Sequence, residues 1–304
     1  MTSIAWIGLG NMGSRMSAHL VSAGHDVRGY DVVDALRDGA ASHGITPVAS
    51  VGEAVDGADV VILSLPKGEH VRAVLAGEDG VFAHAAANTL ILDTSTVDLE
   101  TSAWCHSEAS ARGFRFVDSP VSGGIQGAEA ATLAFMLGGA EADVAAAKEI
   151  VAPMAGNVLA VGEPTHGIAA KLVNNMMLGV SILAMSEGAQ LAKELGLDAQ
   201  SFFDVARVSS GDSWALRTWY PVPGVVPGAA ANHNFDASFS AMLCHKDVTL
   251  AVDGAEAAGV HVPAATLIRD QLQRLLDDGF GGKDCTLVIR ETSRDGSVDG
   301  WDGR

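Results

Sequence analysis

Three glycines near the start of the chain have the spacing of a dinucleotide-binding turn. Gly8, Gly10 and Gly13 match the pattern G-x-G-x-x-G, after a short apolar run and before a segment with helical spacing. In such a turn the first glycine allows the sharp bend, the second lets the backbone approach a pyrophosphate, and the third lets the helix pack on the strand. The sequence therefore predicts a pyrophosphate site at the helix N-terminus, with Asn11 and Met12 completing the loop.

An acidic residue stands where a ribose-binding group is expected. Asp31 follows the next apolar run, eighteen residues after Gly13. Its carboxylate is placed to accept hydrogen bonds from the ribose hydroxyls of adenosine, and its charge would repel a 2′-phosphate. Because no Arg follows it directly, we expect NAD rather than NADP as the cofactor. The alternative is a purely structural turn beside a surface Asp.

The elements that position this turn alternate between strands and helices. Buried parallel strands are short runs of Val, Ile and Leu without polar alternation, and the stretches between such runs here have helical spacing. This order predicts an α/β fold, with an N-terminal Rossmann domain built on a doubly wound, mostly parallel sheet. The expected strands are Ile4–Ile7, Asp26–Tyr30, Val60–Leu65, Leu90–Leu92, Arg115–Val117, Leu133–Leu137 and Val158–Val161.

The second half of the chain has helical spacing almost throughout. One long apolar run from Gly167 to Leu195 predicts a helix that joins the Rossmann domain to an all-α domain. We expect a dinucleotide-binding domain over 1–163, a helical substrate and oligomerisation domain over 164–292, and a flexible tail over 293–304. Polar residues interrupt the long run, which indicates a buried helix rather than a membrane span.

Composition excludes several classes of function. The net charge of −18 and the absence of a basic cluster argue against a nucleic-acid partner. Three isolated cysteines and scattered histidines form no metal-binding pattern, so no metal is expected. The first residues lack the features of a signal peptide, and we expect a cytoplasmic protein without a membrane partner.

Six sequence blocks carry a resemblance to a known family. The chain resembles the β-hydroxyacid dehydrogenase family, which includes 6-phosphogluconate dehydrogenase, over nearly its whole length to about Glu291. The sixth block is similar to a loop typical of the 3-hydroxyisobutyrate dehydrogenase branch. In chain order, the first five blocks are GLGNMG at 8–13, DTSTVD at 93–98, DSPVSGG at 118–124, GIAAKLVNN at 167–175 and KDVTLA at 246–251. The sixth, SSGDSWALRTWYPVPG, lies at 209–224.

The resemblance implies NAD-dependent oxidation of a small hydroxy acid, with 3-hydroxyisobutyrate as the expected substrate. It assigns the substrate carboxylate to Ser122, Gly123 and Gly124, where successive glycine N–H groups can form an anion-binding concavity. Lys171 is the expected general acid and base, because an unpaired ammonium on an apolar helix is costly without a role. Asn175 follows one helical turn later and can hold the substrate hydroxyl. The alternatives are a plain Gly-Gly turn and a snorkelling surface Lys.

The same resemblance assigns the remaining site residues. Leu65, Pro66, His70 and Thr96 are expected to line the cofactor cleft, and Lys246 to reach the dinucleotide from the second domain. Closure of the two domains would then exclude water. Two further residues, Asp247 and Phe239, would complete the substrate pocket. For Lys246 and Asp247 the alternative is a surface ion pair.

Other activities stay open at this stage. They are oxidation of L-serine or 3-hydroxypropionate, reduction of a semialdehyde or glyoxylate with NADPH, an imine reductase, and a non-catalytic dinucleotide-binding module. The long apolar helix lies in an intersubunit core in the family, so a homodimer or homotetramer is expected. Thr165, His166 and His245 depart from the family pattern around the lysine blocks.

Overall fold

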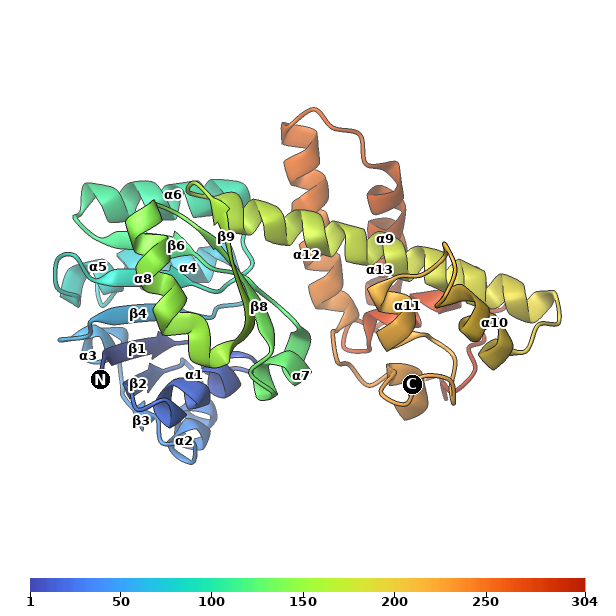
Figure 1. Ribbon diagram of the computed structural model, residues 1–304, viewed down its shortest axis with the longest axis horizontal. Helices are drawn as coiled ribbons and strands as arrows, with labels where there is room; N and C mark the ends of the chain where they lie inside the picture. Colours follow the sequence, from blue (N-terminus) through green and yellow to red (C-terminus); the bar gives the residue numbers. More distant parts are fainter. Residues whose placement is uncertain (304) are drawn as a thin grey trace. The chain divides into compact units, whose positions relative to one another are not determined.

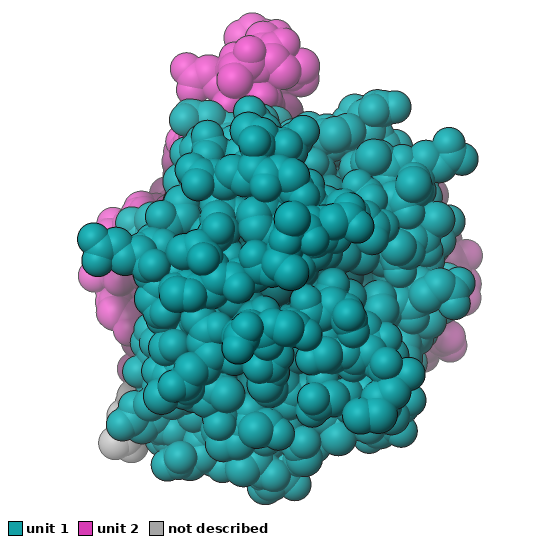
Figure 2. All heavy atoms as spheres, turned by 90° about the vertical axis from the view of Figure 1, so that its left-hand side faces the viewer, with its two compact units in different colours: residues 1–171 teal, residues 172–304 magenta. Residues whose placement is uncertain are grey.

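The computed structural model describes residues 1–303 and divides into two compact units, unit 1 (residues 1–171) and unit 2 (residues 172–304), coloured separately in Figure 2. The division falls inside one long helix, α9 (His166–Glu194), eight residues after the expected boundary at 163/164. The physical reason is that the first turn of α9 is hydrogen-bonded to Asp118 of unit 1.

Unit 1 is built on a nine-stranded sheet (Figure 1). Its order is β3-β2-β1-β4-β5-β6-β8-β7, with β9 paired to β8. All pairings from β3 to β6 are parallel, whereas β8 runs antiparallel to β6 and β7 and parallel to β9. The strands are β1 (Ser3–Ile7), β2 (Asp26–Tyr30), β3 (Thr46–Pro47), β4 (Val60–Leu63), β5 (Leu90–Asp93), β6 (Arg115–Asp118), β7 (Val121–Ser122), β8 (Leu133–Gly138) and β9 (Ala155–Gly162).

Helices cover both faces of this sheet, which confirms the doubly wound arrangement. Every residue of β4 and β5 is buried, as expected for parallel strands that are covered on both sides. Ile4 and Trp6 of β1 belong to the cluster that includes α1 and α8, whereas their neighbours Ala5 and Ile7 face the other way. The helices of unit 1 are α1 (Gly13–Ser22), α2 (Asp34–Ala41), α3 (Val51–Val55), α4 (Gly68–Ala76), α5 (Val81–His84), α6 (Leu99–Ala111), α7 (Gly124–Glu129), α8 (Glu141–Val151) and the 3-10 turn η1 (Ala152–Met154).

The described part of unit 2 is helical around its own core, which confirms the all-α second domain. The core contains Ile182 and Met185 of α9 together with Phe235, Val248 and Leu272. At Gly179 an added Cβ would lie 2.9 Å from Val248, so α9 and α12 cross at close range there. The other elements are α10 (Ala199–Ala206), α11 (Trp214–Trp219), η2 (Ala230–His233), α12 (Ala241–Ala257), α13 (Pro263–Asp277) and η3 (Cys285–Thr292).

Helix α9 is long and apolar enough to cross a membrane by length and composition alone. Its most apolar stretch has a mean hydropathy of 1.5, and 44% of that stretch is buried inside the protein. Ile182, Leu183 and Met185 pack into the core of unit 2, and Lys171 adds a charge near the start of the helix. These contacts are those of a core helix.

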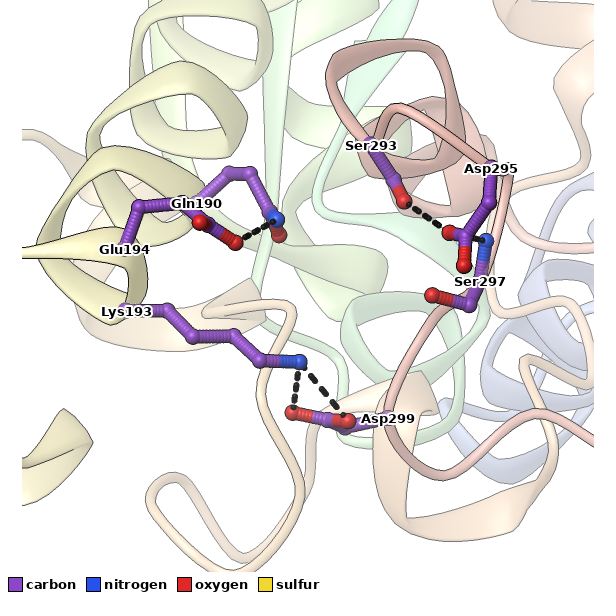
Figure 3. A network of polar contacts seen from close by, with 7 residues as sticks. All are labelled: Gln190, Lys193, Glu194, Ser293, Asp295, Ser297 and Asp299. Carbon is purple, nitrogen blue, oxygen red and sulfur yellow. Dashed lines mark hydrogen bonds and ion pairs between the residues drawn. The ribbon is translucent and has the colours of Figure 1, made fainter.

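The tail expected to be flexible contacts unit 2. Asp299 accepts two hydrogen bonds from Lys193 of α9, at 3.0 and 2.9 Å, as Figure 3 shows. Ser293 and Ser297 both donate to Asp295, and these bonds lower the pKa of that carboxyl to about 2. Trp301 packs edge-on against Phe280 at 4.9 Å between ring centres. Flexibility of the tail stays a prediction, and its last residue, 304, lies outside the described residues.

Candidate active site

The glycine turn has the geometry that the sequence predicts. Gly8 adopts a φ of +99°, and a Cβ there would lie 2.2 Å from the Ser64 carbonyl oxygen. A Cβ on Gly13 would lie 1.9 Å from the Gly8 carbonyl oxygen, so this glycine is required for the helix to pack on the turn. In contrast, a Cβ on Gly10 meets nothing within 4 Å. The turn is therefore closed at Gly8 and Gly13 and open at Gly10, as a pyrophosphate site requires.

The N-terminus of α1 is suited to an anion. The helix has no side-chain hydrogen bond at its N-cap, Met12, and no acidic residue in its first turn. Asn11 is exposed and Met12 is partly buried, so the loop before the helix is accessible. Amide groups and the helix dipole there can bind phosphate oxygens without competition from a carboxylate of the first turn.

Asp31 connects the end of β2 to the glycine turn. Its Oδ2 accepts a hydrogen bond from the Leu9 amide at 2.8 Å, and its Oδ1 accepts one from the Val33 amide at 2.9 Å. Each carboxylate oxygen has a second lone pair, which can accept from a ribose hydroxyl. Arg37 forms an ion pair with Asp34 at 2.6 Å and also donates to the Asp31 carbonyl oxygen. The guanidinium nearest Asp31 is therefore already paired.

The loops after β4 and β5 are tied together at the carboxyl edge of the sheet. The Leu65 amide donates to Ser95 at 2.9 Å, and the Thr94 hydroxyl donates to the Leu63 carbonyl at 2.6 Å. These bonds hold Leu65 and the partly buried Thr96 on neighbouring loops. Two more predicted cofactor residues, Pro66 and His70, are exposed near the start of α4. A nucleotide bound at the glycine turn would extend along this edge.

The segment predicted to bind the substrate carboxylate has an open backbone. Ser122 ends β7, and Gly123 and Gly124 follow with φ values of +138° and +64°. Both glycines are exposed, and a Cβ on Gly124 would meet nothing within 4 Å. Successive amides in such conformations can point at a common anion.

Lys171 and Asn175 are both buried on α9. Lys171 is 8% exposed and belongs to unit 1, as do the glycine turn and Ser122. Asn175 is 4% exposed and lies one helical turn further along the helix. A snorkelling surface Lys would expose its ammonium, so the burial of Lys171 favours the catalytic interpretation.

Unit 2 holds Asn175 through a buried carboxylate. The Asn175 amide donates to Asp247 at 2.6 Å, and Lys246 forms an ion pair with the other oxygen of Asp247 at 3.1 Å. Asp247 is 5% exposed, so this pair is not the surface ion pair of the alternative interpretation. Phe239, the last predicted pocket residue, is partly buried and stacks on Trp219.

Three residues depart from the family pattern, and each has a distinct local environment. Thr165 adopts the left-handed conformation, with a φ of +74°, which explains why glycine is usual at this position. His166 accepts a hydrogen bond from the Glu163 amide at 3.2 Å within its own turn. Burial, followed by the charge of Arg269, lowers the pKa of His245. Among the described residues, no group of three His, Cys, Asp or Glu side chains could hold a metal ion.

Sequence reasoning missed two side chains that support the site, the buried Asp118 and the partly buried His106. Asp118 accepts hydrogen bonds from the amides of Thr165 and Ile168, and His106 lies 2.7 Å from the same carboxylate. The DSPVSGG block contains Asp118, but these partners are 47 and 50 residues later in the chain. Nothing in the local pattern connects them.

Family models cover both units of the chain. A model described as the NAD-binding domain of 6-phosphogluconate dehydrogenase matches residues 3–162. A second model, described as NAD-binding of NADP-dependent 3-hydroxyisobutyrate dehydrogenase, matches residues 165–292.

Similar proteins include dehydrogenases with two named substrates. A probable 3-hydroxyisobutyrate dehydrogenase of Mycobacterium tuberculosis is 46% identical over 270 residues, which cover 89% of this chain and 91% of that protein. An NAD-dependent L-serine dehydrogenase of Pseudomonas aeruginosa is 36% identical over 288 residues, covering 95% and 97%. A solved structure of the M. tuberculosis 3-hydroxyisobutyrate dehydrogenase with L-serine aligns with a TM-score of 0.90 and 44% identity, over 96% of this chain and 99% of that chain.

The second and third glycines of the turn, Gly10 and Gly13, should respond differently to alanine. Gly10→Ala should fold with an unchanged Tm but bind NADH at least about 10-fold more weakly, because its methyl group projects into the phosphate site. Gly13→Ala should lower the Tm, because its methyl group overlaps the Gly8 carbonyl. Thermal melts and NADH fluorescence titrations measure both effects. Full NADH affinity in Gly10→Ala would contradict this placement of the pyrophosphate.

Proposed function

This chain belongs to the β-hydroxyacid dehydrogenase family, in the branch of the 3-hydroxyisobutyrate dehydrogenases, and from that premise we propose that it oxidises 3-hydroxyisobutyrate to methylmalonate semialdehyde. The observation that carries the proposal is the burial of Lys171 on α9, one helical turn before an Asn that Asp247 holds in place. The enzyme is an NAD-dependent oxidoreductase that acts on a CH–OH group.

NAD, when bound, supplies the acceptor for the hydride that leaves the alcohol carbon. The open backbone at Gly10 and the N-terminus of α1 hold its pyrophosphate, and Asp31 accepts hydrogen bonds from the ribose. Leu65, Pro66, His70 and Thr96 line the rest of the cofactor site, and Lys246 supplies a positive charge toward the dinucleotide. The hydrogen bonds between the loops after β4 and β5 support the assignment of Leu65 and Thr96.

The protein residues bind the substrate at both ends and move its proton. Ser122, Gly123 and Gly124 bind the carboxylate through backbone amides and the Ser hydroxyl. Lys171, as a neutral amine, accepts the hydroxyl proton while the hydride leaves, and it returns the proton in the reverse reaction. Asn175 holds the hydroxyl oxygen at the correct distance, and Asp247 fixes the orientation of Asn175.

L-serine is the strongest alternative substrate, because one relative is named for it and one similar structure contains it. L-serine carries an ammonium group where 3-hydroxyisobutyrate carries a methyl group. Asp247 is a buried carboxylate that accepts a hydrogen bond from Asn175 and could bind this ammonium group. However, Lys246 already pairs with it. A carboxylate that is already paired with Lys246 is a weak partner for a second ammonium group, which favours the substrate that carries a methyl group there.

Two observations bear on the choice between NAD and NADP, and they point in opposite directions. The description of the second family model names NADP, whereas Asp31 and the pairing of Arg37 disfavour a 2′-phosphate. A reductase of semialdehydes or glyoxylate that uses NADPH is therefore the less favoured activity. Lys171 distinguishes the enzyme from an imine reductase or a non-catalytic module, because both typically lack this Lys. We place the reaction in valine degradation in the cytoplasm.

We infer a homodimer or homotetramer from the apolar surface of unit 2. Val173, Met177, Ala184 and Leu191 are exposed on one face of α9, whereas Ile182, Leu183 and Met185 on its other faces are buried. An exposed apolar face of this length on a core helix is typical of an interface.

The substrate proposal is tested by mixing the protein with (S)-3-hydroxyisobutyrate and NAD and following NADH at 340 nm. We expect this pair to give a higher kcat/KM than L-serine, 3-hydroxypropionate or NADP. Lys171→Ala should lower kcat by roughly 10²–10⁴-fold, the usual contribution of a positioned acid-base group, while it still binds NADH. Lys148→Ala, on the exposed face of α8, is the matched control. Full turnover in Lys171→Ala would exclude the proposed base.

Assembly is tested by light scattering on a sizing column. We expect a mass of two or four times the 31.2 kDa chain, and Met177→Asp should shift it toward the single chain because a charge would be buried in the apolar face. Leu159→Asp replaces an equally apolar, exposed residue of β9 in unit 1 and should leave the mass unchanged. A monomeric wild-type protein would refute this assembly.

A further inference from the structure

A single buried carboxylate receives three hydrogen bonds at the start of α9. Asp118 is 1% exposed, and it accepts from the Ile168 amide at 2.8 Å and from the Thr165 amide at 3.0 Å. His106 Nε2 lies 2.7 Å from Oδ1, and since a carboxylate only accepts, the histidine donates. All four residues belong to unit 1.

The surroundings of Asp118 are shaped to admit its carboxylate. A Cβ on Gly167 would lie 2.5 Å from the Met136 carbonyl oxygen and 2.7 Å from Asp118 Oδ2, and a Cβ on Gly138 would lie 2.5 Å from the Gly167 amide nitrogen and 2.9 Å from Asp118 Oδ1. Thr165 holds a φ of +74° in order to present its amide, a conformation that disfavours a β-branched residue. Backbone and carboxylate are thus packed closely around Asp118, which leaves its side chain little room to move.

Asp118 connects two parts of the proposed active site through short segments. In one direction the chain runs from Asp118 at the end of β6 to Ser122, four residues later. In the other direction its hydrogen bond to Ile168 lies one helical turn before Lys171. A displacement of Asp118 would therefore move the carboxylate-binding segment and the base relative to each other.

His106 links the same carboxylate to the cofactor edge of the sheet. It lies on α6, which begins directly after the DTSTVD block and is capped by Asp98 through the Thr101 amide at 2.6 Å. Its side chain is 12% exposed and meets the ring of Phe116 edge-on at 4.8 Å between ring centres. The ring is therefore fixed by packing as well as by its hydrogen bond.

We propose that Asp118 and His106 are positioning residues, which set Lys171 relative to the carboxylate-binding segment Ser122–Gly124. Asp118 fixes the first turn of the helix that carries the base, and the hydrogen bond from His106 fixes the orientation of the Asp118 carboxylate. Neither residue contacts the reacting atoms. This inference rests on the proposed function, because it assigns Lys171 the role of base.

The test compares two variants of His106 that differ in hydrogen bonding but little in size. His106→Leu removes the donor, whereas His106→Gln keeps an N–H group that can reach Asp118. We expect His106→Leu to lower kcat about 10-fold, since a small misplacement of a catalytic group has effects of this order. The KM for NAD and the Kd for NADH should stay within twofold of wild type, and His106→Gln should recover most of kcat.

Hydrogen exchange at the Thr165 and Ile168 amides gives a readout that needs no substrate. These two amides should exchange faster in the His106→Leu protein than in the wild type. In the His106→Gln protein they should exchange at the wild-type rate. Unchanged kcat and exchange in His106→Leu would overturn the inference, and so would an equal loss of kcat in both variants, which would assign the effect to packing. If the wild type oxidises none of the hydroxy acids, the proposed function fails, and exchange alone then decides whether His106 and Asp118 fix the helix start.

Discussion

The start of α9 needs partners for its amide groups, and the buried carboxylate of Asp118 accepts hydrogen bonds from the Ile168 amide of the first turn and from the amide of Thr165, the residue before the helix. A negative charge at this end of the helix is also favoured by the helix dipole. Because the bond joins the helix to the end of β6, Lys171 is carried by a rigid element that is fixed to the sheet. The glycine turn and the Ser122 segment belong to the same unit, so the proposed base, cofactor loop and carboxylate-binding segment share one framework.

In each of the two units, buried polar groups are held by specific partners. Asp247 is bonded to Asn175 and paired with Lys246, and Asp118 is bonded to two amides and a histidine. A buried charge without such partners would cost several kcal/mol, so removal of one partner destabilises the arrangement more than removal of the whole group would. The same partners restrict side-chain motion, which is what catalysis by positioning requires.

Much of the fold follows from local patterns in the sequence, whereas the support of the site does not. The strands β1, β4 and β5 were predictable because each is a continuous apolar run, but β3 has only the two exposed residues Thr46 and Pro47 and gives no such signal. The glycine turn is a local motif and was predictable in detail. The bond between Asp118 and Ile168 spans 50 residues, and the bond between Asn175 and Asp247 spans 72, so only the folded chain brings these partners together.

In the proposed reaction, Lys171 takes the hydroxyl proton of a substrate whose carboxylate is bound by Ser122–Gly124. A crystal structure with NAD and 3-hydroxyisobutyrate tests it most directly. The substrate hydroxyl should lie about 3 Å from Lys171 Nζ, within hydrogen-bond reach of a general base, with the carboxylate on the Ser122 segment. A well-ordered substrate whose hydroxyl contacts another titratable group, with Lys171 out of reach, would contradict the role of Lys171 as the base.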